Sequence, residues 1–188
     1  KSLKESIKFI FNPKVFFSKS ATSDYKVFFI NQIIMLLISP HLLTQITIAT
    51  ALYFFFFEIN FIDMGLFATA PKYLIISLFT LTHFVVDDFS KYIVHRWMHR
   101  WPFLWALHKV HHSATNLTPM TVFRTHPLEG LVFTLRSAFA QGLTISTFVY
   151  LFGGGVDLYT VLGANLFVFL FNVFGSNLRH SHIGIRYW

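Results

Sequence analysis

The stretch of sequence that decides the fold is residues 88–112, which read DFSKYIVHRWMHRWPFLWALHKVHH. His95 and His99 are four residues apart, and a helix therefore places both imidazoles on one face. Asp88 falls on the same face two turns earlier, where its carboxylate can accept a ring N–H and fix the tautomer of a metal-binding histidine. The stretch predicts a helix that presents two imidazoles and a supporting carboxylate.

A second histidine group follows the break at Trp101-Pro102. A helix that begins seven residues after the tryptophan puts His108 and His111 on adjacent turns, with His112 beside them. Together with His180 the two groups offer six imidazoles, more than the four ligands of one tetrahedral zinc. Because the chain has no Cys, this donor set predicts iron, zinc or copper, and two ions more naturally than one.

Other reactions lack their sequence motifs. The chain has no His-Glu-x-x-His, so a zinc protease would lack its base, and no Gly-x-Ser-x-Gly, so a serine hydrolase would lack its nucleophile. Phosphate-binding glycine motifs are absent too, and Gly153-Gly154-Gly155 is read as a turn. Taken singly, each histidine is more often a headgroup contact or a helix cap than a ligand, so the metal prediction depends on the clustering.

Composition places the chain in a membrane. Of 188 residues, 54% are hydrophobic, 25 are Phe and only 12% are charged, whereas a soluble domain carries about a quarter charged residues. We therefore predict an all-α integral membrane fold with about four transmembrane helices. The apolar segments are 27–57, read as one kinked crossing or a short re-entrant hairpin around Pro40, then 73–86 continuing through Tyr92, 131–151 and 158–174.

Positive charge sets the predicted orientation. Six Lys lie in residues 1–26 and five further basic residues in 87–127, whereas the loops 58–72 and 152–157 hold only Lys72. We expect the amino terminus and the histidines on the cytoplasmic side. The net charge of +7 is then explained by anionic lipid, and no nucleic-acid partner is needed. The predicted domains are a basic membrane-proximal arm (1–26), either an interfacial helix or a solvated tail, and a membrane domain (27–188).

The ordered motifs over residues 84–188 resemble the fatty acid hydroxylase superfamily, which includes sterol desaturases, sterol methyl oxidases, carotene hydroxylases and alkylglycerol monooxygenase. The motifs that carry the resemblance are His95-Arg-Trp-Met-His99, His108-Lys-Val-His111-His112, Arg124-Thr-His126-Pro127-Leu-Glu129 and Asn177-x-x-His180-Ser-His182. The family's third histidine box is missing; we expect the chain to be truncated before it, and a fragment without it to be inactive.

The resemblance implies a membrane-bound oxidoreductase that uses two iron ions and O2 to hydroxylate or desaturate a lipid, with zinc as a substitute in a purified sample. An external donor such as cytochrome b5, ferredoxin or a reductase would supply electrons. The implied metal ligands are His95, His99, His108, His111, His112 and His180, supported by Asp88, while the roles of His126 and His182 stay open. The alternatives are a non-catalytic membrane metal-binding or transport protein and a metal-stabilised structural relic of the family.

Overall fold

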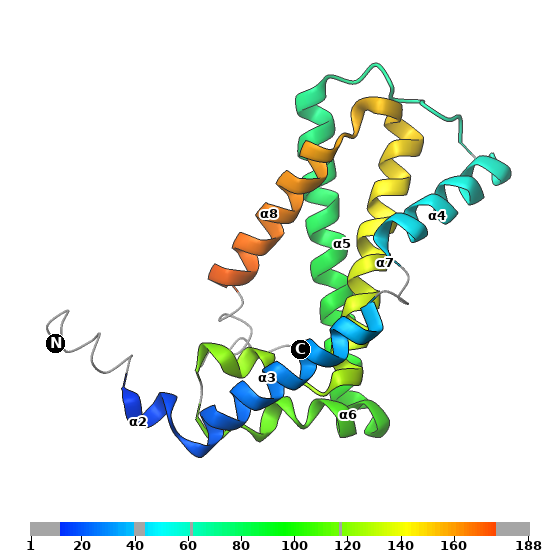
Figure 1. Ribbon diagram of the computed structural model, residues 1–188. Coiled ribbons are helices and arrows are strands. Elements are labelled where there is room, and N and C mark those ends of the chain that lie inside the picture. Colours follow the sequence, from blue (N-terminus) through cyan, green and yellow to red (C-terminus); the bar gives the residue numbers. More distant parts are fainter. Residues whose placement is uncertain (1–11, 40–43, 61, 117, 176–188) are drawn as a thin grey trace, which may run out of the picture. The chain divides into compact units, whose positions relative to one another are not determined.

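The computed structural model of the chain describes residues 12–39, 44–60, 62–116 and 118–175 (Figure 1). This part of the chain is helical and contains no β-strand, which confirms the all-α prediction. Its α-helices are α2 (Pro13–Phe16), α3 (Lys19–Ile38), α4 (Gln45–Ile59), α5 (Lys72–Arg100), α6 (Pro102–His108), α7 (Pro127–Phe152) and α8 (Leu158–Gly175). The short 3-10 helices are η2 (His111–Ser113), η3 (Pro119–Phe123) and η4 (Gly153–Gly155).

The chain divides into two compact units. The histidine unit comprises the described parts of 1–42 and 91–136, and the apolar unit comprises the described parts of 43–90 and 137–188. Helices α5 and α7 contribute residues to both units.

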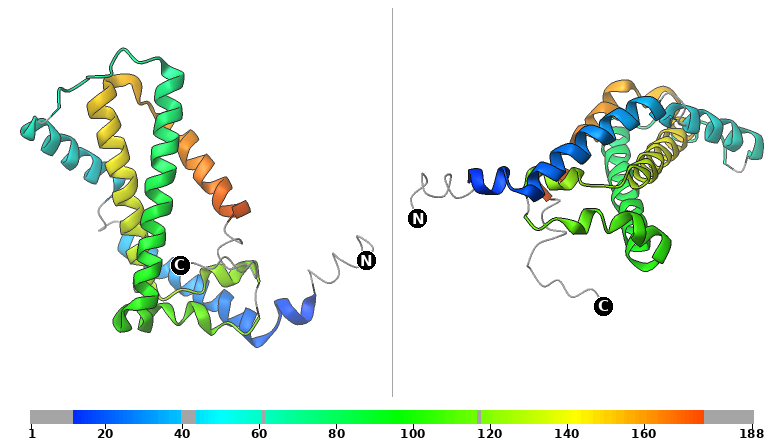
Figure 2. Two further views of the ribbon diagram at one scale, coloured as in Figure 1. Left: turned by 180° about the vertical axis from the view of Figure 1, so that it is seen from behind. Right: turned by 60° about the horizontal axis from the view of Figure 1, so that its bottom comes forward.

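The apolar unit is packed around aromatic side chains where α5, α7 and α8 meet. Phe79 of α5 is fully buried and meets Phe148 of α7 edge to face, with ring centroids 5.3 Å apart. Phe84, also on α5, makes the same kind of contact with Phe171 of α8 at 4.7 Å. Figure 2 shows α5 beside both of these helices. Burial of Phe79 and Phe148 stabilises the unit.

Small and polar residues also set helix contacts in this unit. A Cβ on Gly142 of α7 would lie only 2.8 Å from the Ile48 side chain of α4, so the two helices approach at a distance that only glycine permits. Gln141 Nε2 donates to Asn165 Oδ1 of α8. Asn165 thus packs between helices.

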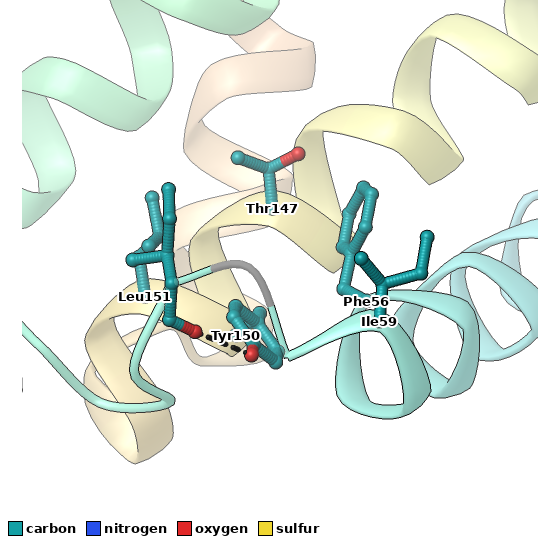
Figure 3. A pocket seen from close by; sticks show the side chains of 6 residues that line it. Phe56, Ile59, Thr147, Tyr150 and Leu151 are labelled. Atoms are coloured by element: carbon teal, nitrogen blue, oxygen red, sulfur yellow. Dashed lines mark hydrogen bonds between the residues drawn. The ribbon is translucent and has the colours of Figure 1, made fainter.

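A small apolar pocket lies near one end of α7 (Figure 3). It has a volume of about 230 Å³, and its lining contains neither a histidine nor a carboxylate. Tyr150 O–H donates to the carbonyl of Ile62 at 2.6 Å and holds the loop after α4 against α7. The lining residues are Phe56, Ile59, Ile62, Thr147, Tyr150 and Leu151.

The predicted helices over 73–92, 131–151 and 158–174 are confirmed as α5, α7 and α8. The first apolar segment differs from the prediction. The Ser18 side chain accepts the N–H of Ala21 at 3.2 Å, so α3 begins at Lys19, inside the basic arm, and crosses the predicted domain boundary at 26/27. With 20 residues, α3 is long enough to cross a membrane by itself.

Two helices in the described part of the chain, α3 and α5, have the length and apolar composition of a membrane span, while α4 and α8 are shorter. On α3 the apolar side chains of Ile33, Leu36 and Leu37 are largely exposed, as suits a helix in contact with lipid. The four-crossing arrangement stays a prediction. The predicted interfacial helix near the amino terminus and the Pro40-His41 break lie outside the described residues.

Candidate metal site

The first part of the site is the end of α5. His95 and His99 lie one turn apart, and their Nε2 atoms are 3.2 Å from each other. The helix stops at Arg100 because Pro102 disfavours a helical residue before it. The predicted pairing of these two imidazoles on one helix face is confirmed.

The second part of the site is built by α6 and the turn after it. This helix begins at Pro102, the favoured first helical position for proline, and ends at His108. The prediction of a helix that begins near His108 is therefore wrong. His111 and His112 instead lie on the separate 3-10 helix η2, which brings the Nε2 atoms of His112 and His108 to 3.1 Å.

The two parts converge on one cluster. The candidate ligand atoms of His95, His99 and His108 all lie within 4.8 Å of one another. The His112 ring centroid is 4.9 Å from that of His99 and 4.8 Å from that of His108. His111 stacks on His108 at 5.6 Å. The five imidazoles of residues 95–112 that the sequence singles out are thus gathered in one place.

The spacing of the donor atoms fits a metal ion. Two nitrogens about 2.1 Å from one ion, at right or tetrahedral angles, lie about 3.0–3.4 Å apart. The His95–His99 and His108–His112 Nε2 separations, 3.2 and 3.1 Å, fall inside this range. Imidazole nitrogen suits iron, zinc and copper. The residues present therefore fit the metal centre that the sequence predicts.

Glu129 is a site residue that sequence reasoning missed. Its Oε1 lies 2.7 Å from His108 Nδ1, and both side chains are buried, at 3% and 2% exposure. A carboxylate in this position accepts a hydrogen bond from the Nδ1–H group. The Nε2 atom then has its lone pair free to bind a metal. The available signal was that Glu129, in the first turn, is the only acidic residue of α7.

Trp105 is a second missed residue. Its ring centroid lies 5.5 Å from those of His99 and His112, so the half-exposed indole covers one side of the cluster. The usable signal was its position on α6, three residues before His108 and so on nearly the same helix face.

The remaining predicted site residues are placed as follows. Asp88 is half-buried on α5, about two turns before His95, and its supporting role stays a prediction. His126 lies at the start of α7, where its Nδ1 accepts the Leu128 N–H at 3.2 Å. His180 and His182 lie outside the described residues.

His83 is buried on α5 and stacks on Phe79 at 6.1 Å between ring centroids. It belongs to the apolar unit, apart in sequence from the histidines of residues 95–112.

The region that contains this site is similar to known proteins. The fatty acid hydroxylase family model matches residues 80–187, more than half of the chain. The Delta(7)-sterol 5(6)-desaturase of Eremothecium gossypii is 36% identical over 73 residues, which are 38% of this chain and 20% of the relative. A putative methylsterol monooxygenase of Dictyostelium discoideum is 29% identical over 133 residues, which are 67% of this chain and 45% of the relative.

The Delta(7)-sterol 5(6)-desaturase of Saccharomyces cerevisiae is 42% identical over 60 residues, 31% of this chain and 16% of the relative. The chain thus matches less than half the length of each of these curated relatives. No solved structure matches it significantly. Since the family model spans both histidine groups and most of α5 to α8, the chain belongs to the fatty acid hydroxylase and sterol desaturase superfamily.

Proposed function

We propose that the chain is the histidine-bearing part of a membrane oxidoreductase that uses two iron ions and O2 to hydroxylate or desaturate a lipid. The observation that carries the proposal is the convergence of His95, His99 and His108, whose ligand atoms lie within 4.8 Å of one another. The family match and the sterol-modifying enzymes among the relatives support a lipid substrate of the sterol or fatty acyl type.

Each residue of the site has a proposed role. The five imidazoles of residues 95–112 hold the metal together with His180, and Asp88 supports them from the second turn before His95. When bound, iron supplies the activation of O2 and the removal of hydrogen from an unactivated C–H bond. Glu129 accepts a hydrogen bond from the Nδ1–H of His108 and thereby orients the His108 ring so that Nε2 faces the metal. Trp105 keeps water from one side of the cluster.

The proposed setting is a multi-pass membrane protein with its histidines on the cytoplasmic side. The lipid carbon that reacts would reach the histidines from the bilayer, and electrons would come from an external donor of the cytochrome b5, ferredoxin or reductase type. The apolar, exposed side chains of α3 and the length of α5 support the membrane part of this proposal.

Metal content tests the proposal directly. We expect about two iron ions per molecule of full-length protein purified without chelators, and loss of iron from the double variant His108→Ala, His111→Ala. The matched control is His126→Asn, because asparagine can still cap α7. Full-length protein without iron, or with one ion that the double variant retains, would overturn the metal assignment.

Turnover separates the enzyme from the alternative of a metal-binding or transport protein. Full-length protein that holds iron should consume O2 when supplied with a reductant and a sterol or fatty acyl lipid, and mass spectrometry should find a product with one added oxygen or two fewer hydrogens. Iron-loaded protein that consumes no O2 with any lipid of these classes would favour the non-catalytic alternative.

Orientation can be tested by single cysteines, since the chain contains none. Lys109→Cys, at an exposed position between α6 and η2, should be labelled only from the cytoplasmic side. Asp63→Cys, exposed in the loop after α4, should be labelled only from the opposite side. Labelling of Lys109→Cys from outside the cell would refute the proposed orientation.

A further inference from the structure

The histidine unit contains a buried ion pair that none of the proposed chemistry uses. Arg124 Nε donates to Asp24 Oδ1 of α3, and the two residues are 5% and 0% exposed. The Thr121 hydroxyl donates to the other carboxylate oxygen at 2.8 Å. The pair therefore fastens α3 to the segment that follows η2. A buried ion pair is weak evidence for stability alone, because desolvation cancels much of the attraction.

The Arg124 guanidinium also reaches beyond the carboxylate. Its Nη2 donates to the Ser20 carbonyl of α3 at 2.5 Å, and its Nη1 donates to Ser113 Oγ at 3.3 Å. The planar fork of an arginine can serve all of these acceptors at once, whereas a lysine ammonium is a single point charge. Arg124 thus connects α3 to the residue that directly follows the second histidine group.

Ser113 in turn closes the turn that carries two candidate ligands. Its hydroxyl donates to the Val110 carbonyl at 2.7 Å, and its backbone N–H donates to the same oxygen at 3.2 Å. His111 and His112 lie between these two residues in the chain. The position of Ser113 therefore sets the path of the backbone from which both imidazoles project.

We propose that Arg124, held in place by Asp24, is a positioning residue for the metal site: it fixes Ser113 and thereby the placement of His111 and His112. The inference rests on the proposed function, because that function makes His111 and His112 of this turn metal ligands. It adds to that function a polar connection from the fully buried carboxylate of α3 to the histidine turn.

Cobalt binding to metal-free full-length protein tests the inference, because the visible absorption of Co²⁺ reports coordination geometry as well as affinity. Ser113→Ala should weaken Co²⁺ binding by about 10-fold, the lower end of the effect of residues behind metal ligands, and should shift the absorption bands. The matched control is Ser23→Ala, which removes a hydroxyl bonded only to its own helix, at the Lys19 carbonyl (2.9 Å).

Arg124→Lys tests the connection itself. It keeps a positive charge beside Asp24 but loses the fork, and it should weaken and shift Co²⁺ binding in the same direction. The matched control, Asp157→Asn, breaks the ion pair with Lys72 in the apolar unit and should leave the cobalt spectrum unchanged. If the two residues act through one contact, the double variant Ser113→Ala, Arg124→Lys should lose less affinity than the sum of the single losses.

The outcomes separate the inference from the proposed function. Ser113→Ala and Arg124→Lys proteins that bind Co²⁺ with the affinity and spectrum of the wild type, or whose affinity losses add, would overturn the inference alone. A wild-type protein that binds no Co²⁺ would overturn the proposed function. If Arg124→Lys fails to fold, an unchanged Ser113→Ala spectrum still overturns the inference.

Discussion

Each of the two units is stabilised internally by a different kind of contact. The histidine unit depends on buried polar pairs, of which His108–Glu129 and Asp24–Arg124 are the clearest. In the apolar unit the buried core consists of Ile75, Phe79, Phe148, Phe152 and Ala164. Apolar packing stabilises without direction, whereas a hydrogen bond fixes the orientation of a ring. The difference indicates that orientation matters most where the histidines lie.

The largest expected effect follows the loss of charge behind His108. Glu129→Gln keeps the size of the side chain but removes the carboxylate that faces Nδ1 at 2.7 Å. We expect metal affinity to fall by about 10–100-fold, measured by Co²⁺ titration of full-length protein. The control is Glu58→Gln, at an exposed position on α4. Equal Co²⁺ affinities for Glu129→Gln and wild type would show that the buried polar pair does not orient His108 for metal binding.

A packing defect in the apolar unit should lower stability. Gly142→Ala places a Cβ 2.8 Å from the Ile48 side chain and 3.0 Å from the Gln45 carbonyl, and overpacking of this kind costs about 1–3 kcal/mol. The control is Gly163→Ala on α8, where no atom lies within 4 Å of the new Cβ and where helix propensity gains up to about 1 kcal/mol.

Thermal unfolding in detergent measures both glycine variants. The contrast between the units predicts that Gly142→Ala retains wild-type metal affinity. A parallel loss of affinity would show that packing in the apolar unit also governs the site.

A spectroscopic effect is expected at Trp105. Because its indole lies 5.5 Å from His99 and His112, Co²⁺ should quench its fluorescence. Trp105→Phe should remove most of the quenching. Trp97→Phe, which changes an exposed indole stacked on Trp101 at 5.8 Å, should retain it. Quenching that survives in Trp105→Phe would contradict the position of the indole against the cluster.

The smallest effect concerns the first turn of α8. The hydrogen bond from Lys72 lowers the pKa of Asp157, and the hydroxyl and N–H of Thr160 add to the shift. A lowered pKa stabilises the fold above the unfolded value of about 4, and this contribution is lost as the pH falls through the lower folded value. The protection factors of the amides in this turn, which correct exchange rates for their intrinsic pH dependence, should therefore stay constant from pH 7 to pH 5.

Asp157→Asn is the matched variant for this turn, because asparagine keeps the helix cap without a titrating group. Wild-type protection at the start of α8 should fall below about pH 4, and the variant should show no such fall. Protection that falls alike in both proteins would assign the pH dependence to another group.

Much of the fold could be predicted from the sequence because apolar runs and histidine spacing are local signals. Helices α5, α7 and α8 follow from their apolar composition, and the His95–His99 pair follows from helix periodicity. The start of α3 was misjudged because six lysines in residues 1–26 suggested an arm, whereas the Ser18 cap begins the helix at Lys19. Pro102 was read only as a break, although proline also begins helices.

The residues behind the histidines could not be predicted in the same way. Glu129 meets His108 across 21 positions of sequence, and Asp24 meets Arg124 across 100. Such pairs depend on how distant segments of the chain pack in three dimensions. Neither composition nor periodicity carries information about that packing. Two signals were available: the only acidic residue of α7 lies in its first turn, and one aspartate lies among lysines in residues 1–26. Each signal suggests a buried partner but does not identify that partner.

The ion pair on α3 has a mechanical consequence. In the membrane arrangement that we propose, α3 tilts to match the thickness of the surrounding bilayer. Asp24 is part of that helix, and Asn31, two turns further along it, donates to the Thr125 carbonyl at 2.8 Å next to Arg124. A tilt of α3 would therefore pull on the backbone beside the second histidine group, and bilayer thickness would then alter the spacing of the imidazoles that we propose as metal ligands.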